Sequence, residues 1–235
     1  MELYLVAGIV LVTILIVLLL IRSSKSGDSV ILLGLCDSGK TSLFGQLTTG
    51  KELKTQTSII ENKGKISTTA TKNGKPWKLI DIPGHERVRD KYFYNNKDNA
   101  RGILFLIDSV NFPREIRDVA ECMYDLLANR TMQRNKVSVM VACNKQDIPT
   151  AKSHNVIKSQ LEKELNKLRQ TRSAALLGID DYSSSRNAFI GKQGKDFEFS
   201  HVNPIKVEFC ECNLKNTQVE GEVKVDGVRT WLEKL

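Results

Sequence analysis

The sequence has few cysteines and no motif of the kind that reads nucleic acid bases. Its five cysteines are an odd number, and most of them lie in apolar runs, so a disulfide framework is disfavoured and a reduced, cytosolic compartment is indicated. A chain of 235 residues is too short for two domains of roughly 200 residues each. Its mixture of apolar and charged residues excludes general disorder. We therefore expect one globular core with an appendage.

The beginning of the chain lacks charge. Leu3 to Ile21 contains no charged residue, and as a helix it would be about 28 Å long, close to the hydrocarbon thickness of a bilayer. A cleaved signal peptide, the alternative, normally has a basic start, a shorter apolar core and small residues at the cut, whereas this chain begins Met1-Glu2 and continues after the stretch with Arg22-Ser23-Ser24-Lys25. Arg22 and Lys25 follow the stretch, whereas only Glu2 precedes it, which places the rest of the chain in the cytosol. We predict a retained transmembrane anchor over 1–22, a linker over 23–29 and a cytosolic domain over 30–235.

Strand-like and helix-like segments alternate along the domain. Apolar runs of strand length occupy 30–33, 77–82, 103–107, 137–142 and 205–209, and helical spacing of apolar residues marks 41–47, 116–127, 157–168 and 228–235. A further strand over 65–72 would form a hairpin through Asn73 and Gly74. This alternation predicts an α/β fold with a six-stranded, mostly parallel, doubly wound sheet and one antiparallel edge strand. The polar stretch 170–204 is predicted to be a flexible insertion.

A phosphate-binding motif follows the first of these strands. Gly34 to Thr41 fits G-x-x-x-x-G-K-[ST] between a strand and a helix, where backbone N–H groups and the helix N-terminus surround phosphates. Lys40 would contact the β- and γ-phosphates, and the Thr41 hydroxyl would ligate Mg²⁺. The motif alone does not choose between ATP and GTP. The residues predicted to bind nucleotide here are Gly34, Leu35, Cys36, Asp37, Ser38, Gly39, Lys40, Thr41 and Ser42.

The preference for guanine comes from Asn144-Lys145-Gln146-Asp147, at the carboxyl end of a predicted parallel strand. The Asp147 carboxylate can accept hydrogen bonds from N1 and N2 of guanine, a pair that adenine does not offer. Such a site can reject the mismatched ligand by about 10⁴-fold. Asn144 would brace the loop, and the Lys145 stem would lie along the base. Alone, the four residues could be a turn after a strand; after a phosphate loop they predict GTP or GDP.

Asp81-Ile82-Pro83-Gly84 follows the second strand of the predicted hairpin. Asp81 can hold a water bound to Mg²⁺, and the Gly84 N–H can approach the γ-phosphate because no Cβ is in the way. Pro83-Gly84 on its own would be only a turn. With the other two motifs in this order, it predicts a switch that responds to the γ-phosphate.

These motifs, in their order and spacing, resemble those of the Ras-like small GTPases across Ser29 to Leu235. The resemblance implies two further elements. One is a final guanine loop, in which Cys212, Asn213 and Leu214 would lie beside the base and Asn213 replaces the serine usual in that family. The other is a first switch, whose Thr57 would be a second Mg²⁺ ligand; an ordinary loop threonine is the alternative. The switch residues are Gln56, Thr57, Ser58 and Ile59.

A narrower resemblance is to the family of signal recognition particle receptor β subunits. It rests on the uncharged N-terminal stretch, the phosphate loop, the Thr-Gln-Thr-Ser-Ile switch, Pro83-Gly84-His85, the stretch 142–148 and Gln160-Leu161-Glu162-Lys163-Glu164-Leu165. It implies a protein of the endoplasmic reticulum membrane that holds the N-terminal domain of the receptor α subunit in a GTP-dependent manner during co-translational targeting. The ribosome or the translocon would be further partners, and no sequence-specific binding of nucleic acid is expected.

Two departures from the small GTPase pattern bear on hydrolysis. His85 stands where many relatives have a water-orienting glutamine, and it either does similar work or points away. Cys36 occupies a position where glycine often leaves room for an arginine finger. We expect slow turnover, with GTP-dependent partner binding as the main role. The alternatives are an Arf- or Sar-like GTPase of vesicle traffic and an ATP-using P-loop enzyme, which Asp147 opposes.

The net charge of +8 includes a lysine-rich region from Lys51 to Lys78. This region is either a solvated surface or a docking surface for an acidic partner, RNA or anionic headgroups. The sequence leaves these alternatives open.

Overall fold

The computed structural model describes residues 27–50, 58–66, 76–176, 189–215 and 223–235. The predicted membrane anchor, the hairpin turn at Asn73-Gly74 and the switch residues Gln56 and Thr57 lie outside these ranges. Among the described residues, no helix has the length and apolarity needed to cross a membrane.

The sheet has six strands in the order β2-β3-β1-β4-β5-β6. Neighbouring strands are parallel except for β2 and β3, which pair antiparallel with Asn62 opposite Asp81. The predicted sheet is therefore confirmed, with its antiparallel strand at one edge. The strands are β1 (Ser29–Leu33), β2 (Asn62–Ile66), β3 (Trp77–Asp81), β4 (Ala100–Asp108), β5 (Ser138–Asn144) and β6 (Val207–Glu211).

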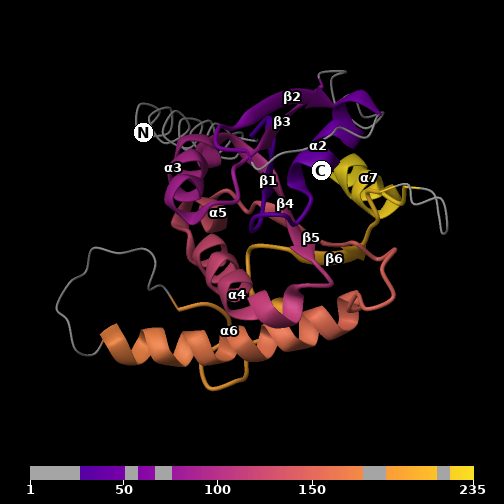
Figure 1. Ribbon diagram of the computed structural model, residues 1–235. Helices are drawn as coiled ribbons and strands as arrows, with labels where there is room; N and C mark the ends of the chain where they lie inside the picture. The colour runs from indigo at the N-terminus through magenta and orange to yellow at the C-terminus, as the bar shows by residue number, and fades with distance from the viewer. Residues whose placement is uncertain (1–26, 51–57, 67–75, 177–188, 216–222) are drawn as a thin grey trace, which may run out of the picture.

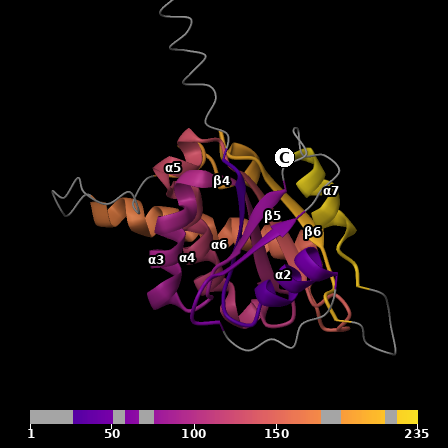
Figure 2. The same ribbon diagram turned by 90° about the horizontal axis from the view of Figure 1, so that it is seen from above.

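Helices cover both faces of the sheet, as a doubly wound fold requires. Figure 1 shows α2 and α7 on one face and α3, α4 and α6 on the other, and Figure 2 shows the same two layers from above. The helices are α2 (Lys40–Thr49), α3 (Glu86–Asn96), α4 (Phe112–Ala128), α5 (Arg130–Arg134), α6 (His154–Leu176) and α7 (Asp226–Lys234), with short 3₁₀ turns η1 (Lys97–Asn99) and η3 (Phe199–His201).

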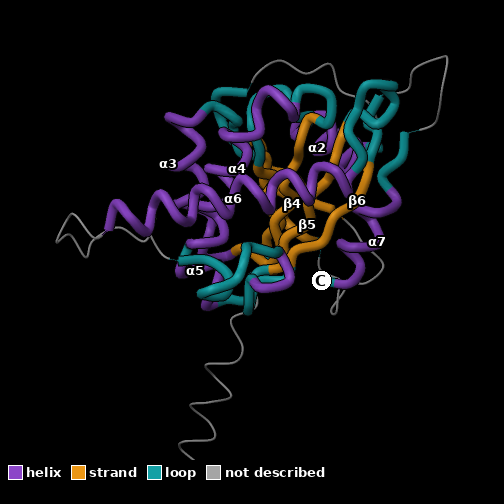
Figure 3. The backbone as a smooth tube through the Cα atoms, turned by 90° about the horizontal axis from the view of Figure 1, so that it is seen from below, coloured by secondary structure: helices purple, strands orange, loops and turns teal. Residues whose placement is uncertain are grey.

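The alternation of side chains along β1 divides the core in two. Val30 and Leu32 belong to the cluster that contains Leu43 of α2 and Trp231 of α7. Their neighbours in β1 belong to the larger cluster beneath α4 and α6. Because successive residues of a strand point to opposite faces, a one-residue shift in register would exchange the two cores. This burial fixes the register of β1. Figure 3 shows the strands running together through the middle of the molecule.

β2 begins at Asn62, three residues before the start of the predicted strand over 65–72. Residues 65 and 66 are in β2, and the buried side chain of Ile66 packs in the α2 cluster; the rest of the predicted strand lies outside the described residues. The earlier start brings Asn62 level with the end of β3.

The prediction of a flexible insertion over 170–204 is wrong for its described parts. Residues 170–176 continue α6, and residues 189–204 pack against the core. Arg169 of α6 is buried and donates to the carbonyl oxygens of Lys192 and Lys195, at 3.2 and 2.6 Å. This one side chain therefore satisfies the backbone of the turn. The apolar residues that the segment buries are Ile190, Phe197, Phe199 and Val202.

Candidate functional site

The loop after β1 is shaped by glycines. Gly34 and Gly39 have φ of 141° and 99°, in a region that disfavours side chains. A Cβ on Gly39 would lie 2.2 Å from Nδ2 of Asn144, and a Cβ on Gly34 would lie 2.3 Å from the carbonyl oxygen of Leu106. The loop therefore wraps closely over the ends of β4 and β5, which leaves its backbone facing outward at the start of α2.

Lys40, the first residue of α2, is 6% exposed. Its Nζ donates to the carbonyl oxygen of Leu35 at 2.6 Å, and the Ser38 hydroxyl donates to the same oxygen at 2.9 Å. Burial lowers the pKa of Lys40, and the nearby Asp81 carboxylate opposes that change. The Lys40 ammonium group is thus poorly solvated and hydrogen-bonded to a backbone carbonyl of the phosphate loop. An incoming phosphate, being charged, would be a stronger hydrogen-bond acceptor than that carbonyl.

Thr41 and Asp81 meet at the next position along the loop. The Thr41 hydroxyl donates to Oδ2 of Asp81 at 2.8 Å and lies 3.3 Å from the Ser58 hydroxyl. Asn62 also donates to Oδ2, at 3.0 Å, whereas the buried Oδ1 has no hydrogen-bond partner. Burial raises the pKa of Asp81, against the effects of Asn62, Thr41 and Lys40.

This arrangement fits Mg²⁺. A buried carboxylate oxygen without a partner is costly, and it is the kind of oxygen that a metal-bound water would satisfy. Thr41 supplies a second oxygen beside it. In this interpretation Thr41 would hold the ion, Asp81 would hold its water, and the ion would neutralise phosphate charge. Ser58 extends the oxygen cluster from the segment that follows Thr57.

Asp81→Asn is expected to stabilise the nucleotide-free protein and to weaken Mg²⁺. Because the folded pKa is raised, the carboxyl group favours folding most at acid pH, and that contribution is lost as the pH rises through the folded value. At neutral pH the variant removes the buried charge. A gain of about 1 kcal/mol would raise the melting temperature by about 2–4 °C, while Mg²⁺ affinity would fall about 10- to 100-fold.

Thermal unfolding and Mg²⁺ titration would measure the two effects, with the exposed Asp118→Asn as the matched control. A variant that loses stability without nucleotide, or that keeps full Mg²⁺ affinity, would contradict this account of Asp81.

Gly84 lies against the phosphate loop. A Cβ there would be 2.6 Å from the backbone nitrogen of Cys36, so only glycine permits this approach. The next residue, His85, is exposed and caps α3, its Nδ1 accepting from the Arg87 N–H at 3.4 Å. The ring is turned onto α3, and a role for His85 in hydrolysis stays a prediction.

We call Asn144-Lys145-Gln146-Asp147, which is predicted to bind the guanine base, the guanine-specific loop, and long-range hydrogen bonds hold it. Asn144 Nδ2 donates to the Ser38 carbonyl oxygen at 2.9 Å and so ties the end of β5 to the phosphate loop. Lys145, with φ of 67°, donates from Nζ to Asp108 at 2.6 Å. Burial opposes ionisation of Asp108, but hydrogen bonds from Lys145 and from the backbone of Asn111 and Val110 leave its pKa lowered. The Lys145 stem is therefore fixed by a charged partner that the sequence analysis did not identify.

The final loop lies beside the guanine-specific loop. The Cys212 thiol donates to Oδ1 of Asn144 at 3.8 Å, and the Gln146 N–H donates to the Cys212 carbonyl oxygen at 3.3 Å. Asn213 accepts from the Lys215 N–H at 3.0 Å and pairs with Lys224. The asparagine that replaces the usual serine therefore closes the loop through its own side chain.

These loops surround a cavity of about 600 Å³, a volume typical of cofactor sites. Four further residues line the cavity that were not predicted to bind nucleotide, namely Ile82, Pro83, Ile148 and Lys215. Among the predicted residues, Gly34, Leu35, Ser38, Ile59, Asp81, His85 and Cys212 are not lining residues, and Ile59 is 75% exposed. The predicted residues that line it are Cys36, Asp37, Gly39, Lys40, Thr41, Ser42, Ser58, Gly84, Asn144, Lys145, Asp147, Asn213 and Leu214.

Comparisons with known proteins agree with this geometry. The sequence profile described as signal recognition particle receptor beta subunit matches residues 25–206. The human signal recognition particle receptor subunit beta is 46% identical over 92% of this chain and 79% of its own length. A Drosophila ADP-ribosylation factor-like protein 2 is 29% identical over 61% of this chain.

Solved structures of SRP receptors are also similar to this chain. The mammalian SRP receptor matches with a TM-score of 0.75 and 43% identity, over 88% of this chain and 98% of that one. A Chaetomium thermophilum receptor SRb with GDP and Mg shares the fold, with a TM-score of 0.66 and 23% identity over 89% of this chain and 97% of its own. The chain belongs to the family of signal recognition particle receptor β subunits.

Proposed function

We propose that this chain is a membrane-anchored GTP-binding subunit that holds the receptor α subunit at the endoplasmic reticulum membrane in a GTP-dependent manner. The observation that carries the proposal is the cavity between the phosphate loop and the guanine-specific loop, which Lys40 and Asp147 both line. A cation for phosphates and an acceptor for guanine donors in one cavity support GTP or GDP as the ligand.

Two contacts support a switch at the phosphate end of the cavity. Ser58, a residue of the first predicted switch, lies beside Thr41, and Gly84 approaches the phosphate loop at Cys36. A γ-phosphate with Mg²⁺ would enter between these segments and bias their positions. A partner that contacts both segments would therefore favour the GTP state by its differential affinity.

Slow hydrolysis is part of the proposal. The His85 ring is occupied as the N-cap of α3, and Cys36 lines the cavity next to Gly84, the residue predicted to approach the γ-phosphate. Both features favour a long-lived GTP state. The Arf- or Sar-like alternative, which cycles in vesicle traffic, would instead need efficient stimulated hydrolysis and a reversible attachment to membranes.

The test is a titration with the N-terminal domain of the α subunit, with GTP and then with GDP loaded. We expect affinity to be higher with GTP by a coupling of about 1 to 3 kcal/mol, roughly 5- to 150-fold. Thr57→Ala would remove the second predicted Mg²⁺ ligand, and GTP would remain bound while affinity for the partner falls toward the GDP value.

Asp118→Asn is the control, because Asp118 is exposed on α4 and does not line the cavity. Equal affinity in the two nucleotide states would remove the switch from the mechanism. Partner binding that also survives without any nucleotide would reduce the chain to a tether.

A further inference from the structure

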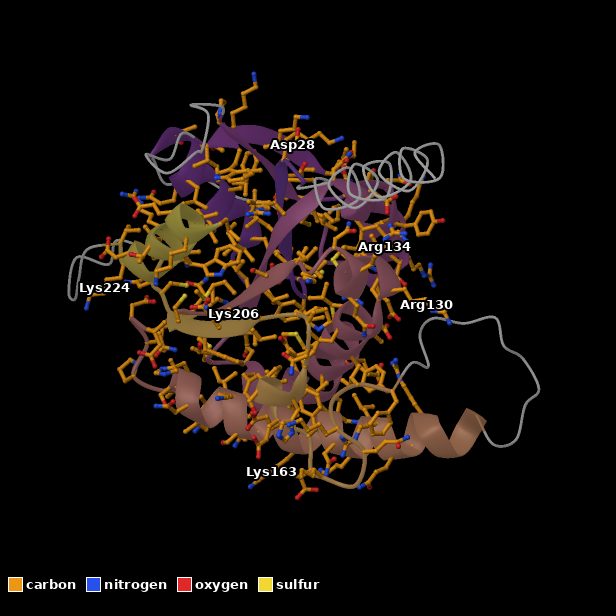
Figure 4. All side chains as sticks on the ribbon, turned by 180° about the vertical axis from the view of Figure 1, so that it is seen from behind. Asp28, Arg130, Arg134, Lys163, Lys206 and Lys224 are labelled. Carbon is orange, nitrogen blue, oxygen red and sulfur yellow. The ribbon has the colours of Figure 1, made fainter. Side chains whose placement is uncertain are left out.

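The edge at which the parallel strands begin lies opposite the nucleotide cavity. Figures 2 and 3 show α5 and the end of α7 at this edge, away from the start of α2. Figure 4 views the molecule from this side. We call this surface the strand-start face, and its basic residues are Lys78, Lys97, Arg101, Arg130, Arg134, Lys136, Lys206 and Lys234.

The chain enters the domain at this face. A Cβ on Gly27 would lie 2.2 Å from the carbonyl oxygen of Asn99, so the backbone at residue 27 is pressed against the residue before β4. Only Arg22 to Ser26 separate this point from the predicted membrane span. Five residues extend over at most about 17 Å, and the strand-start face must therefore lie close to the bilayer if the proposed anchor spans it.

Helix α5 presents two arginines on the strand-start face. The Asn129 side chain caps the helix, accepting from the N–H groups of Thr131 and Met132. Met132 is 1% exposed and fixes the inner side of the helix. Arg130 and Arg134 are four residues apart and both exposed, so they share the outer side. Figure 4 labels both.

Lys136, which follows α5, is exposed and has φ of 52°, a backbone conformation in which glycine or asparagine is more stable. The presence of lysine at this position is therefore not explained by its backbone conformation. Together with Arg101 and Lys234, Lys136 lines a polar hollow of about 150 Å³ beside Gly27. Arg101 is engaged, because its Nε donates to the Leu235 backbone oxygen at 2.9 Å and its Nη2 donates to the same oxygen. Lys136 and Lys234 remain as the available cations of the hollow, whose size suits a phosphate headgroup.

Two lysines of the strand-start face are neutralised by neighbours. Lys78 pairs with Asp28 at 2.6 Å, and Lys206 pairs with Glu208 at 2.8 Å. These exposed pairs contribute little to stability and are screened by salt. Lys78 and Lys206 therefore add no unpaired positive charge to the strand-start face.

Four other cations of this face have no such neighbour. Within the described part of the chain, Arg130, Arg134, Lys136 and Lys234 form no ion pair with a carboxylate. The exposed acids nearby are Asp98 and Glu233. Positive charge therefore remains in excess on the face at which the chain enters the domain.

We propose that the strand-start face is a docking surface for anionic phospholipid headgroups. The inference rests on the membrane anchor of the proposed function. Attraction between this face and the headgroups would act over a Debye length of about 8 Å at physiological salt, and each basic residue near the surface would strengthen the contact about fivefold. Docking would aim the opposite edge, with its nucleotide cavity and switches, into the cytosol where the partner approaches.

The test uses the full chain in lipid nanodiscs and measures amide hydrogen exchange over residues 130–137. We expect exchange to be about fivefold slower or more in discs that contain phosphatidylserine than in discs of phosphatidylcholine alone, and high salt to remove the difference. The difference between the two kinds of disc should be lost in the triple variant Arg130→Gln, Arg134→Gln and Lys136→Gly. Lys163→Gln on α6 is the matched control and should keep it.

Lys136→Gly also separates docking from folding. This substitution removes the unfavourable left-handed backbone conformation of a residue with a side chain, so the melting temperature should be unchanged or raised. Equal exchange in the two kinds of disc would overturn the proposal, as would slowing that survives the triple variant. Slowing by added RNA but not by phosphatidylserine would assign the face to nucleic acid and also overturn it. Loss of the chain from the discs would overturn the anchor and the docking face together, whereas unchanged exchange in retained chains overturns the face alone.

Discussion

Asp147→Asn is expected to weaken GTP binding by about 10⁴-fold and to admit xanthosine triphosphate. Asp147 lines the cavity at the end of β5, where its carboxylate would accept from N1 and N2 of guanine. An asparagine amide would turn a donor toward those donors and leave one of them without a partner. Xanthine carries an oxygen acceptor in place of the N2 amino group, so the amide would suit it.

Competition binding with GTP, ATP and xanthosine triphosphate would measure the change. The loop itself should persist in the variant, because Asn144 and Lys145 are held by Ser38 and Asp108 and Asp147 takes no part in those bonds. Asp98→Asn removes one exposed carboxylate from the strand-start face and should change none of the three affinities. Full guanine selectivity in the Asp147 variant would show that the base lies elsewhere.

The parallel strands were predictable because their burial on both faces leaves uninterrupted apolar runs. The 3.6-residue spacing in α4 and α6 was equally informative. Helix α3 was not predicted because none of its residues is fully buried, so the sequence carries no apolar stripe there. Helix α5 was missed because it has only five residues, too few for a periodic signal.

Other parts of the fold depend on contacts that the sequence does not reveal. The buried residues of 189–204, such as Phe197 and Phe199, have no regular spacing, and their environment is made by Arg169 from another helix. An irregular segment with isolated aromatic residues looks like a flexible loop when only its period is considered. The buried arginine supplies the hydrogen bonds that such a segment needs in order to pack.

The candidate site was largely predictable from its three motifs, because each of them follows a strand whose carboxyl end is at one edge of the sheet. The connections between the motifs were not. Asn144 and Ser38 are 106 positions apart, and Lys145 and Asp108 are 37 positions apart. Asp108 could have been suspected as an acidic residue that ends an apolar strand, but its pairing with Lys145 depends on β4 and β5 being neighbours.

Lys40→Met is expected to remove most of the stabilisation of the folded chain by GTP with Mg²⁺. Lys40 is the buried cation of the phosphate loop, and phosphates bound there without it would leave negative charge uncompensated. Removing one partner of a buried charge pair costs about 3–5 kcal/mol, so affinity should fall by roughly two to four orders of magnitude. Without nucleotide, the variant should be at least as stable as the parent, because burial already disfavours the charged lysine.

Thermal unfolding with and without nucleotide separates these two effects. At a thousandfold excess over its dissociation constant, a ligand stabilises the folded state by about 4.1 kcal/mol, a rise in melting temperature of about 10 °C for a domain of this size. The parent and the exposed control Lys63→Met, whose lysine pairs with Glu61 at 2.7 Å, should both show this rise. Lys40→Met should show at most about a third of this rise, because a hundredfold loss of affinity leaves about 1.4 kcal/mol of stabilisation at that concentration and a ten-thousandfold loss leaves almost none. A full rise in Lys40→Met would mean that another group neutralises the phosphates, and the absence of any rise in the parent would remove GTP as the ligand of the cavity.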